Sequence, residues 1–162
     1  MSNEELTRGV AYPSPFDQLA VELANSAARY IYILSPHLDY EVFDNPDLVN
    51  ALSELARSSR QTEIRILISD SRGLVARGHR LLALARRIPS TVRIQKIEHH
   101  PQWKGQTVVI RDRDGLLFKP ADTNKEAFYL TDSRPETKPY LELFEELWRF
   151  SSEDPELRAL SL

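Results

Sequence analysis

The sequence predicts an α/β domain: a mixed, mainly parallel sheet flanked by helices, with an antiparallel hairpin. Helix-type and strand-type patterns alternate over the first hundred residues, which is typical of parallel strands joined by crossover helices. Strand patterns then cluster before a closing helix. The pair Asp114-Gly115 between two apolar runs predicts a tight hairpin turn.

Length and composition are those of an ordinary globular protein. The chain has 162 residues, a hydrophobic fraction of 41%, a net charge of −3 and no cysteine. We expect one α/β domain over residues 15–150, a polar lead-in over 1–14 and a tail over 151–162. The missing cysteines exclude disulfides and thiolate metal sites, and with no signal-peptide pattern or membrane-length apolar run they lead us to expect a cytoplasmic protein.

The net charge hides an uneven distribution. Residues 1–54 carry two Lys/Arg against nine Asp/Glu, residues 55–104 carry eleven against three, and residues 105–162 carry eight against twelve. A basic middle could bind an anionic partner. It could equally consist of solvated, arginine-rich helix faces, and the sequence leaves both interpretations open.

The first half of the chain gives two helix–strand units. Ser14 as N-cap and Pro15 at the first helical position predict a helix whose apolar residues recur at helical spacing up to Ala27. The β-prone run at 30–34 predicts a strand covered on both faces, which ends before Pro36. A helix from Asn45-Pro46 to Ser58-Ser59 then leads to a strand over 63–69.

The second half begins with one helix and ends with another. We predict a turn at 70–73, a helix over 74–88 closed by Pro89, and an alternating strand over 92–97. The remaining predicted elements are hairpin strands at 105–112 and 116–119, a strand at 127–130, an amphipathic helix at 135–150 and a short helix at 155–160.

The hairpin spacing resembles the phospholipase D-like superfamily, whose signature is His-x-Lys-x4-Asp followed by a glycine turn. On that signature Gly105 takes the place of the histidine, Thr107 that of the lysine, and Asp112 that of the aspartate. Further matches to the family pattern follow in order along the chain: Ile33-Leu34-Ser35-Pro36, Leu52 to Ala56, Ile64-Arg65-Ile66-Leu67-Ile68, Asn124-Lys125-Glu126 and Phe144-Glu145-Glu146-Leu147-Trp148.

The resemblance implies a phospholipase D/nuclease-like fold and, in active members, a specific chemistry. There the histidine attacks the phosphodiester phosphorus, the lysine holds the phosphate oxygens and the aspartate supports them. Glycine has no nucleophilic atom and threonine has no charge, and the family's Gly-Ser-x-x-Asn segment is missing from residues 119–123. We therefore expect the fold without phosphodiesterase activity.

Polar residues follow the first two predicted strands. His37 and Asp39 come after one strand, and Asp70 and Arg72 after the next. Since ligands of α/β proteins bind at the carboxyl ends of parallel strands, a His/Asp pair there could perform general acid–base chemistry. The same aspartates could instead cap the helices that follow.

Two further groups are candidates for ligand contacts. Arg72, Arg77, His79 and Arg80 surround a predicted helix start, where backbone amides favour anions. Next to the signature strand are His99, His100 and Trp103, of which the tryptophan could stack on a partner or simply pack. We expect no metal site from the adjacent histidines, because successive strand residues point to opposite faces.

These observations favour a catalytically inactive phospholipase D-like domain that acts as a binding or scaffolding module. Active members bring two signatures together, so a chain with one signature is expected to form a homodimer or bind a protein partner. Two alternatives stay open: a protein that binds nucleic acid or a phosphorylated ligand, and a phosphodiesterase with a rearranged site built from His37, His79 or His99. No cofactor is expected.

Overall fold

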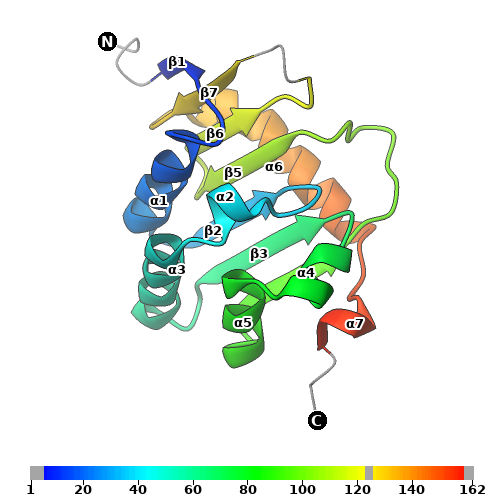
Figure 1. The fold of residues 1–162 in the computed structure, drawn as a ribbon. Helices are drawn as coiled ribbons and strands as arrows, with labels where there is room; N and C mark the ends of the chain where they lie inside the picture. The colour runs from blue at the N-terminus through cyan, green and yellow to red at the C-terminus, as the bar shows by residue number, and fades with distance from the viewer. Residues whose placement is uncertain (1–5, 123–125, 159–162) are drawn as a thin grey trace.

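The computed structural model describes residues 6–122 and 126–158, which form a helix-flanked sheet (Figure 1). The seven strands lie in the order β1-β7-β6-β5-β2-β3-β4. Their bounds are β1 Leu6–Val10, β2 Tyr30–Leu34, β3 Glu63–Ile68, β4 Val92–Lys96, β5 Thr107–Arg111, β6 Gly115–Lys119 and β7 Ala127–Leu130. This mixed sheet confirms the predicted α/β class.

Strand directions divide the sheet into two parts. The neighbours β2, β3 and β4 are parallel, whereas β5 is antiparallel to β2, and each step on through β6, β7 and β1 is antiparallel too. The prediction of a mainly parallel sheet was therefore wrong: of the six strand pairings in the described residues, two are parallel and four are antiparallel, because β5 pairs with β2 and the antiparallel part continues through β6, β7 and β1. Because Val108 pairs with Leu34, β5 begins at the edge of the sheet where the parallel strands end.

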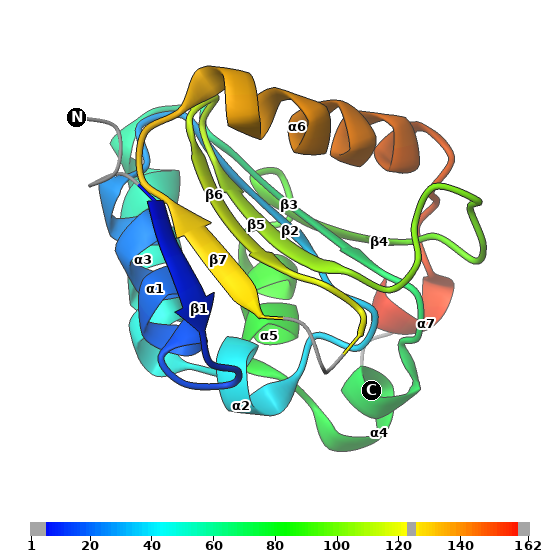
Figure 2. The ribbon, with the colours of Figure 1, turned by 90° about the horizontal axis from the view of Figure 1, so that it is seen from above.

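Helices cover the two faces unequally (Figure 2). One face carries α1 Phe16–Ser26, α3 Pro46–Ser58 and α5 Arg80–Arg87, together with the shorter α2 Tyr40–Phe43, α4 Arg72–Arg77 and α7 Pro155–Arg158. The other face is covered by α6 Arg134–Arg149, along which Phe144 and Leu147 are buried. Two hydrophobic cores therefore lie on opposite faces of one sheet.

Side chains cap the starts of α3 and α6, and for α3 the start agrees with the predicted one at Asn45-Pro46. The Asn45 side chain accepts a hydrogen bond from the Asp47 amide at the start of α3, and Ser133 does the same for Glu136 in α6. For α1 the prediction was wrong, because the residue before the helix is Pro15 and no side chain caps it. Ser14 lies one residue too early to reach the first amides.

The predicted helix over residues 74–88 is two helices. Gly78 interrupts it with φ +83° and ψ 163°, a backbone conformation that only glycine adopts readily, and α5 restarts at Arg80 after the N-cap residue His79. Apolar periodicity continues across the break, so it gives no sign of it. The one-turn helix α2 was also missed, since we predict a loop there.

Described residues on both sides of the predicted domain take part in the fold. Residues 6–10 of the predicted lead-in form the edge strand β1, which pairs with β7. In the predicted tail, Leu157 of α7 is buried in a core, and Ser152 bridges to Lys96 of β4. The predicted helical residues 159–160 lie outside the described part. No helix among the described residues is long and apolar enough to cross a bilayer.

Candidate functional site

The two signature positions that would carry chemistry lie at the edge of the sheet where the parallel strands end. Thr107 is the first residue of β5 and is 3% exposed. Gly105 precedes it with φ +97°, and a Cβ added there would lie 3.5 Å from the Ala121 Cβ. A small side chain has room, but the backbone conformation favours glycine. Neither position offers an imidazole or an ammonium group.

A lysine that the motif comparison missed lies opposite Thr107. Lys119 pairs with Thr107 across the hairpin, and its Nζ lies 4.9 Å from the centre of the Tyr12 ring. Tyr12 in turn donates a hydrogen bond to the Asp39 carboxylate. Burial, reinforced by that bond and the Asp39 charge, raises the pKa of Tyr12 far above its usual range. Hairpin register alone could have placed Lys119 beside Thr107.

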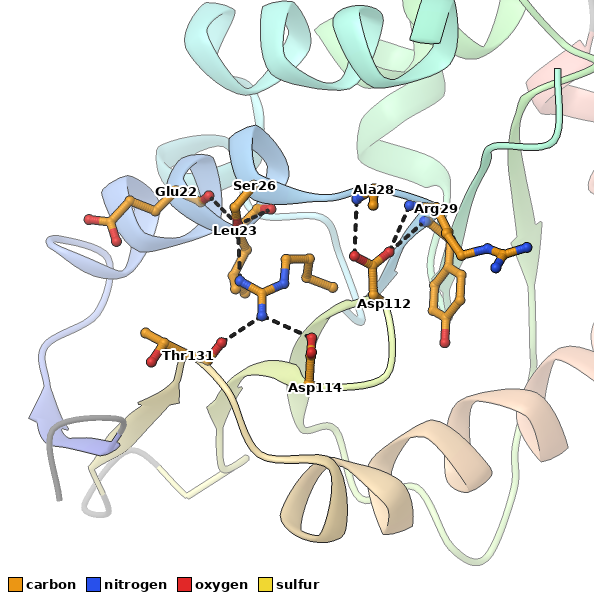
Figure 3. A network of polar contacts seen from close by, with 10 residues as sticks. Glu22, Leu23, Ser26, Ala28, Arg29, Asp112, Asp114 and Thr131 are labelled. Atoms are coloured by element: carbon orange, nitrogen blue, oxygen red, sulfur yellow. Dashed lines mark hydrogen bonds and ion pairs between the residues drawn. The ribbon is translucent and has the colours of Figure 1, made fainter. Parts of the chain in front are cut away.

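Asp112, the signature aspartate, lies at the other end of β5 (Figure 3). Its carboxylate accepts hydrogen bonds from the backbone amides of Ala28, Arg29 and Tyr30, at 3.0, 2.8 and 3.0 Å. Its own amide donates to the Tyr30 carbonyl. Asp112 therefore joins the hairpin turn to the segment that enters β2. It follows the last residue of β5, about 16 Å along the strand from Thr107.

The neighbouring Arg111 ties three elements to this turn. Its guanidinium group donates to the Ser26 hydroxyl at 3.0 Å, to the Asp114 carboxylate at 2.9 Å and to the Thr131 carbonyl at 2.5 Å. Figure 3 shows these three partners converging on one guanidinium group. The aspartate end of the signature hairpin is thus a network of structural contacts.

The loops that follow β2 and β3 bring together different residues from those that we paired. The His37 Nδ1 lies 3.7 Å from Asp70 Oδ2, whereas Asp39 contacts Tyr12. Arg72 donates to Asp70 with its Nε at 3.0 Å, its Nη2 at 2.8 Å and its backbone amide. These hydrogen bonds hold the pKa of Asp70 well below its usual range.

His79 is buried and both ring nitrogens are engaged. Nε2 lies 3.0 Å from the Leu38 carbonyl, and Nδ1 accepts the Leu81 amide at 3.0 Å, which assigns the proton of the neutral ring to Nε2. Burial is the largest cause of a lowered pKa, and it outweighs the Asp44 charge and the Leu38 hydrogen bond, which act the other way. His79 therefore caps α5 and has no free nitrogen for acid–base chemistry.

The remaining predicted ligand contacts are distributed over separate partners. The Arg77 guanidinium lies 3.8 Å from the Tyr40 ring centre, and Arg80 lies 3.9 Å from the Asp44 carboxylate. Trp103 is buried and donates to the Gln106 carbonyl, while His100 lies 3.8 Å from Glu146. In residues 6–122 and 126–158 no group of three metal-ligating side chains could hold an ion.

Comparison with known sequences gives one family. The model of a family described as Domain of unknown function (DUF7931) matches residues 12–160. None of the curated proteins matches this chain.

Comparison of structures identifies the fold. Nuc from Salmonella typhimurium, a phospholipase D family member, superposes with a TM-score of 0.65 at 18% identity, covering 92% of this chain and 97% of Nuc. NucT from Helicobacter pylori gives 0.65 at 13% identity, with the same coverage. TrmBL2, an archaeal chromatin protein with a novel mode of DNA binding, gives 0.63 at 14%, covering 92% of this chain and 53% of TrmBL2. The chain has a phospholipase D-like fold, as the hairpin spacing predicts.

Proposed function

This chain belongs to the family described as Domain of unknown function (DUF7931), and we propose that it is a catalytically inactive phospholipase D-like domain acting as a binding or scaffolding module. One observation carries the proposal. At the edge of the sheet where the signature would act, Gly105 and Thr107 supply neither a nucleophile nor a cation. At the other end of the same strand, Asp112 keeps a full set of structural hydrogen bonds.

The other histidines give little support to a rearranged catalytic site. Both nitrogens of His79 are occupied, and the side chain of His37 is 65% exposed, next to an aspartate that Arg72 already engages. A general base needs a free nitrogen and a fixed direction toward its substrate. We infer that selection has kept the fold for contacts with a partner.

Hydrolysis of a generic phosphodiester, bis(p-nitrophenyl) phosphate, tests the missing activity. The purified chain is expected to release no nitrophenol above the buffer rate between about pH 5 and pH 8, the range over which a histidine would act. The controls are His37→Ala and His79→Ala, which remove two of the three imidazoles named in the rearranged-site hypothesis; the third is His99. Turnover in the parent chain that either variant abolishes would overturn the proposal.

Self-association is part of the proposal and has its own measurement. Active members of the superfamily bring two signatures together, so a chain with one signature is expected to retain a twofold interface. Sedimentation velocity from about 1 to 100 μM should show a dimer population that rises with concentration, as mass action requires. A monomer throughout would leave binding to a different protein as the scaffolding role.

A second candidate function is nucleic-acid binding. It is favoured by the eleven basic residues within 55–104 and by the similar fold of TrmBL2. Against it, several of those side chains have partners within the chain: Arg72 binds Asp70, Arg77 covers Tyr40 and Arg80 contacts Asp44. Phosphate contacts would make affinity for DNA fall steeply between about 50 and 200 mM salt, which a titration at several salt concentrations measures.

A further inference from the structure

A cleft of about 500 Å³ lies at the end of the sheet where the parallel strands β2 and β3 begin, opposite the end at which Gly105 and Thr107 lie. Arg29 contributes to it from the residue before β2, Gln61 from just before β3, Arg113 from the β5–β6 turn and Arg134 from the first turn of α6. Tyr30 and Tyr32 of β2 also line it. Four segments far apart in the sequence thus meet around one hollow, in a volume typical of small-ligand sites.

The carboxylates of this cleft are already engaged. Asp112 accepts three backbone amides, and Asp114 accepts from Arg111. Glu63 accepts from Arg65 at 3.1 Å and from the Tyr32 hydroxyl at 3.3 Å. Arg111 and Arg65 each bring a positive charge to one of these carboxylates. The acceptor groups of the cleft therefore offer little to a ligand.

The donors of the cleft are free by contrast. Within the described part of the chain, the guanidinium groups of Arg29, Arg113 and Arg134 make no ion pair or hydrogen bond, and neither does the Tyr30 hydroxyl. In Figure 3 the Arg29 side chain extends away from the Asp112 carboxylate, which is bonded to backbone nitrogens. The hydrogen-bond donors of this cleft are free and its carboxylate acceptors are already bonded, so it suits a ligand rich in anionic oxygens. Guanidinium groups match phosphate oxygens in bidentate geometry.

An aromatic wall forms one side of the cleft. Tyr30 stacks on Tyr32 with ring centres 4.4 Å apart, and Tyr32 stacks on Phe144 at 4.6 Å. Tyr32 thus covers one face of the Tyr30 ring and fixes its orientation, and the rest of the ring surface can contact a ligand. A planar base next to a fixed tyrosine gains stacking energy whatever its sequence identity.

A neighbouring hollow along α6 shares Arg113 and Arg134 but has a different charge balance. There Lys138 pairs with Glu142, and Arg149 pairs with Glu146. Besides Arg113 and Arg134, the cations of this hollow are therefore neutralised by carboxylates of α6 itself. The free donors concentrate in the cleft beside Tyr30.

We propose that this cleft binds a nucleoside phosphate, with the phosphate held by Arg29, Arg113 and Arg134 and the base against Tyr30. The inference rests on the binding role proposed above and names a ligand class and a site for it. The ligand could be a free nucleotide or one nucleotide of a single strand. Both present the same phosphate and base to the cleft.

Isothermal titration of the full chain tests the site with three probes: inorganic phosphate, ADP and a single-stranded thymidine oligonucleotide. The triple variant Arg29→Ala/Arg113→Ala/Arg134→Ala removes the free guanidinium groups. The matched control Arg8→Ala/Arg87→Ala/Lys104→Ala removes the same charge from exposed side chains outside the cleft. Tyr30→Leu removes the aromatic surface but keeps the guanidinium groups.

ADP is expected to bind more tightly than phosphate, and the cleft variant should weaken ADP about tenfold or more while the control stays within about twofold. Tyr30→Leu should weaken ADP and leave phosphate unchanged. Oligonucleotide binding that the cleft variant abolishes would identify a strand as the source of the nucleotide. No binding of any probe at about 1 mM, or equal loss in the control, would overturn the inference and leave the hydrolysis result untouched.

Discussion

At the scale of single residues, Asp112 has a structural role at a motif position, although the motif positions of the histidine and the lysine are occupied by Gly105 and Thr107. Asp112 has φ +50°, a conformation in which aspartate and asparagine are tolerated better than other side chains. Its carboxylate accepts hydrogen bonds from three successive amides: those of Ala28 and Arg29, which precede β2, and that of Tyr30, its first residue. These amides thus have a partner at the point where the strand begins. This role depends on the fold alone.

Asp112→Ala is expected to lower the free energy of unfolding by about 2 kcal/mol, because three backbone amides lose a charged acceptor and alanine fits poorly at positive φ. Urea denaturation followed by circular dichroism measures the change. Asp112→Asn is the control, because asparagine tolerates the same φ and keeps one carbonyl acceptor. We expect it to lose about half as much. An alanine variant as stable as the parent chain would show that these bonds contribute nothing.

Sequence reasoning at this scale succeeded where the interaction is local. The signature spacing placed Thr107 and Asp112 on one hairpin, and in the structure Thr107 begins β5 and Asp112 follows it. Gly105, which we predict within the strand, lies in a bend two residues before β5. Sequence reasoning could not pair Asp39 with Tyr12, 27 residues away, or show that His79 bonds the Leu38 carbonyl, 41 residues away. Such contacts depend on how the loops pack against one another. The order of side chains along a single loop does not predict that packing.

At the scale of elements, Gly78 decides where one helix stops and the next begins. Its φ of +83° and ψ of 163° fall in a region that is almost restricted to glycine, and an added Cβ would meet no atom within 4 Å. Any cost of a substitution there therefore comes from the backbone. Gly73, in the first turn of α4, also has open space around its Cβ position but has helical geometry.

The two glycines give a matched pair of alanine substitutions. Gly78→Ala is expected to destabilise the chain by about 1–2 kcal/mol through backbone strain. Gly73→Ala is expected to stabilise it by about 0.5 kcal/mol, since alanine loses less conformational entropy in a helix. Thermal or urea unfolding of both variants checks the signs. Equal effects at the two positions would mean that α4 and α5 are not separated by a glycine-specific turn.

Elements with a strong period were predictable and weak ones were not. Apolar spacing located α1, α3 and α6, and alternation located β3 and β4. The strand β1 was missed because its central residues are exposed, so no inward-facing pattern distinguishes it from a polar lead-in. The division of α4 from α5 was missed because a single glycine within a periodic segment is compatible with a continuous helix.

At the scale of the whole molecule, one sheet separates two cores. Leu52 belongs to the core beneath α1, α3 and α5, and Leu147 belongs to the core beneath α6, and both are fully buried. The central strands contribute to both, since Ile31 and Ile33 of β2 face one core and Tyr32 and Leu34 face the other. The sequence indicated such a strand by its continuous apolar run. It did not indicate that β5 would insert beside β2, since that requires a pairing between distant segments.

Shared strands should make the two cores unfold together, and the tryptophans provide a test. Trp103 and Trp148 both belong to the α6-side core, so their fluorescence reports that core, whereas far-ultraviolet circular dichroism reports all helices and strands. Leu52→Ala, in the opposite core, is expected to cost about 2–5 kcal/mol and to shift both urea curves to the same lower midpoint. Leu147→Ala is the matched change beside the tryptophans and should again move both curves together. If Leu52→Ala shifts the dichroism curve but leaves the fluorescence midpoint in place, the two faces are independent units and the central strands do not couple them.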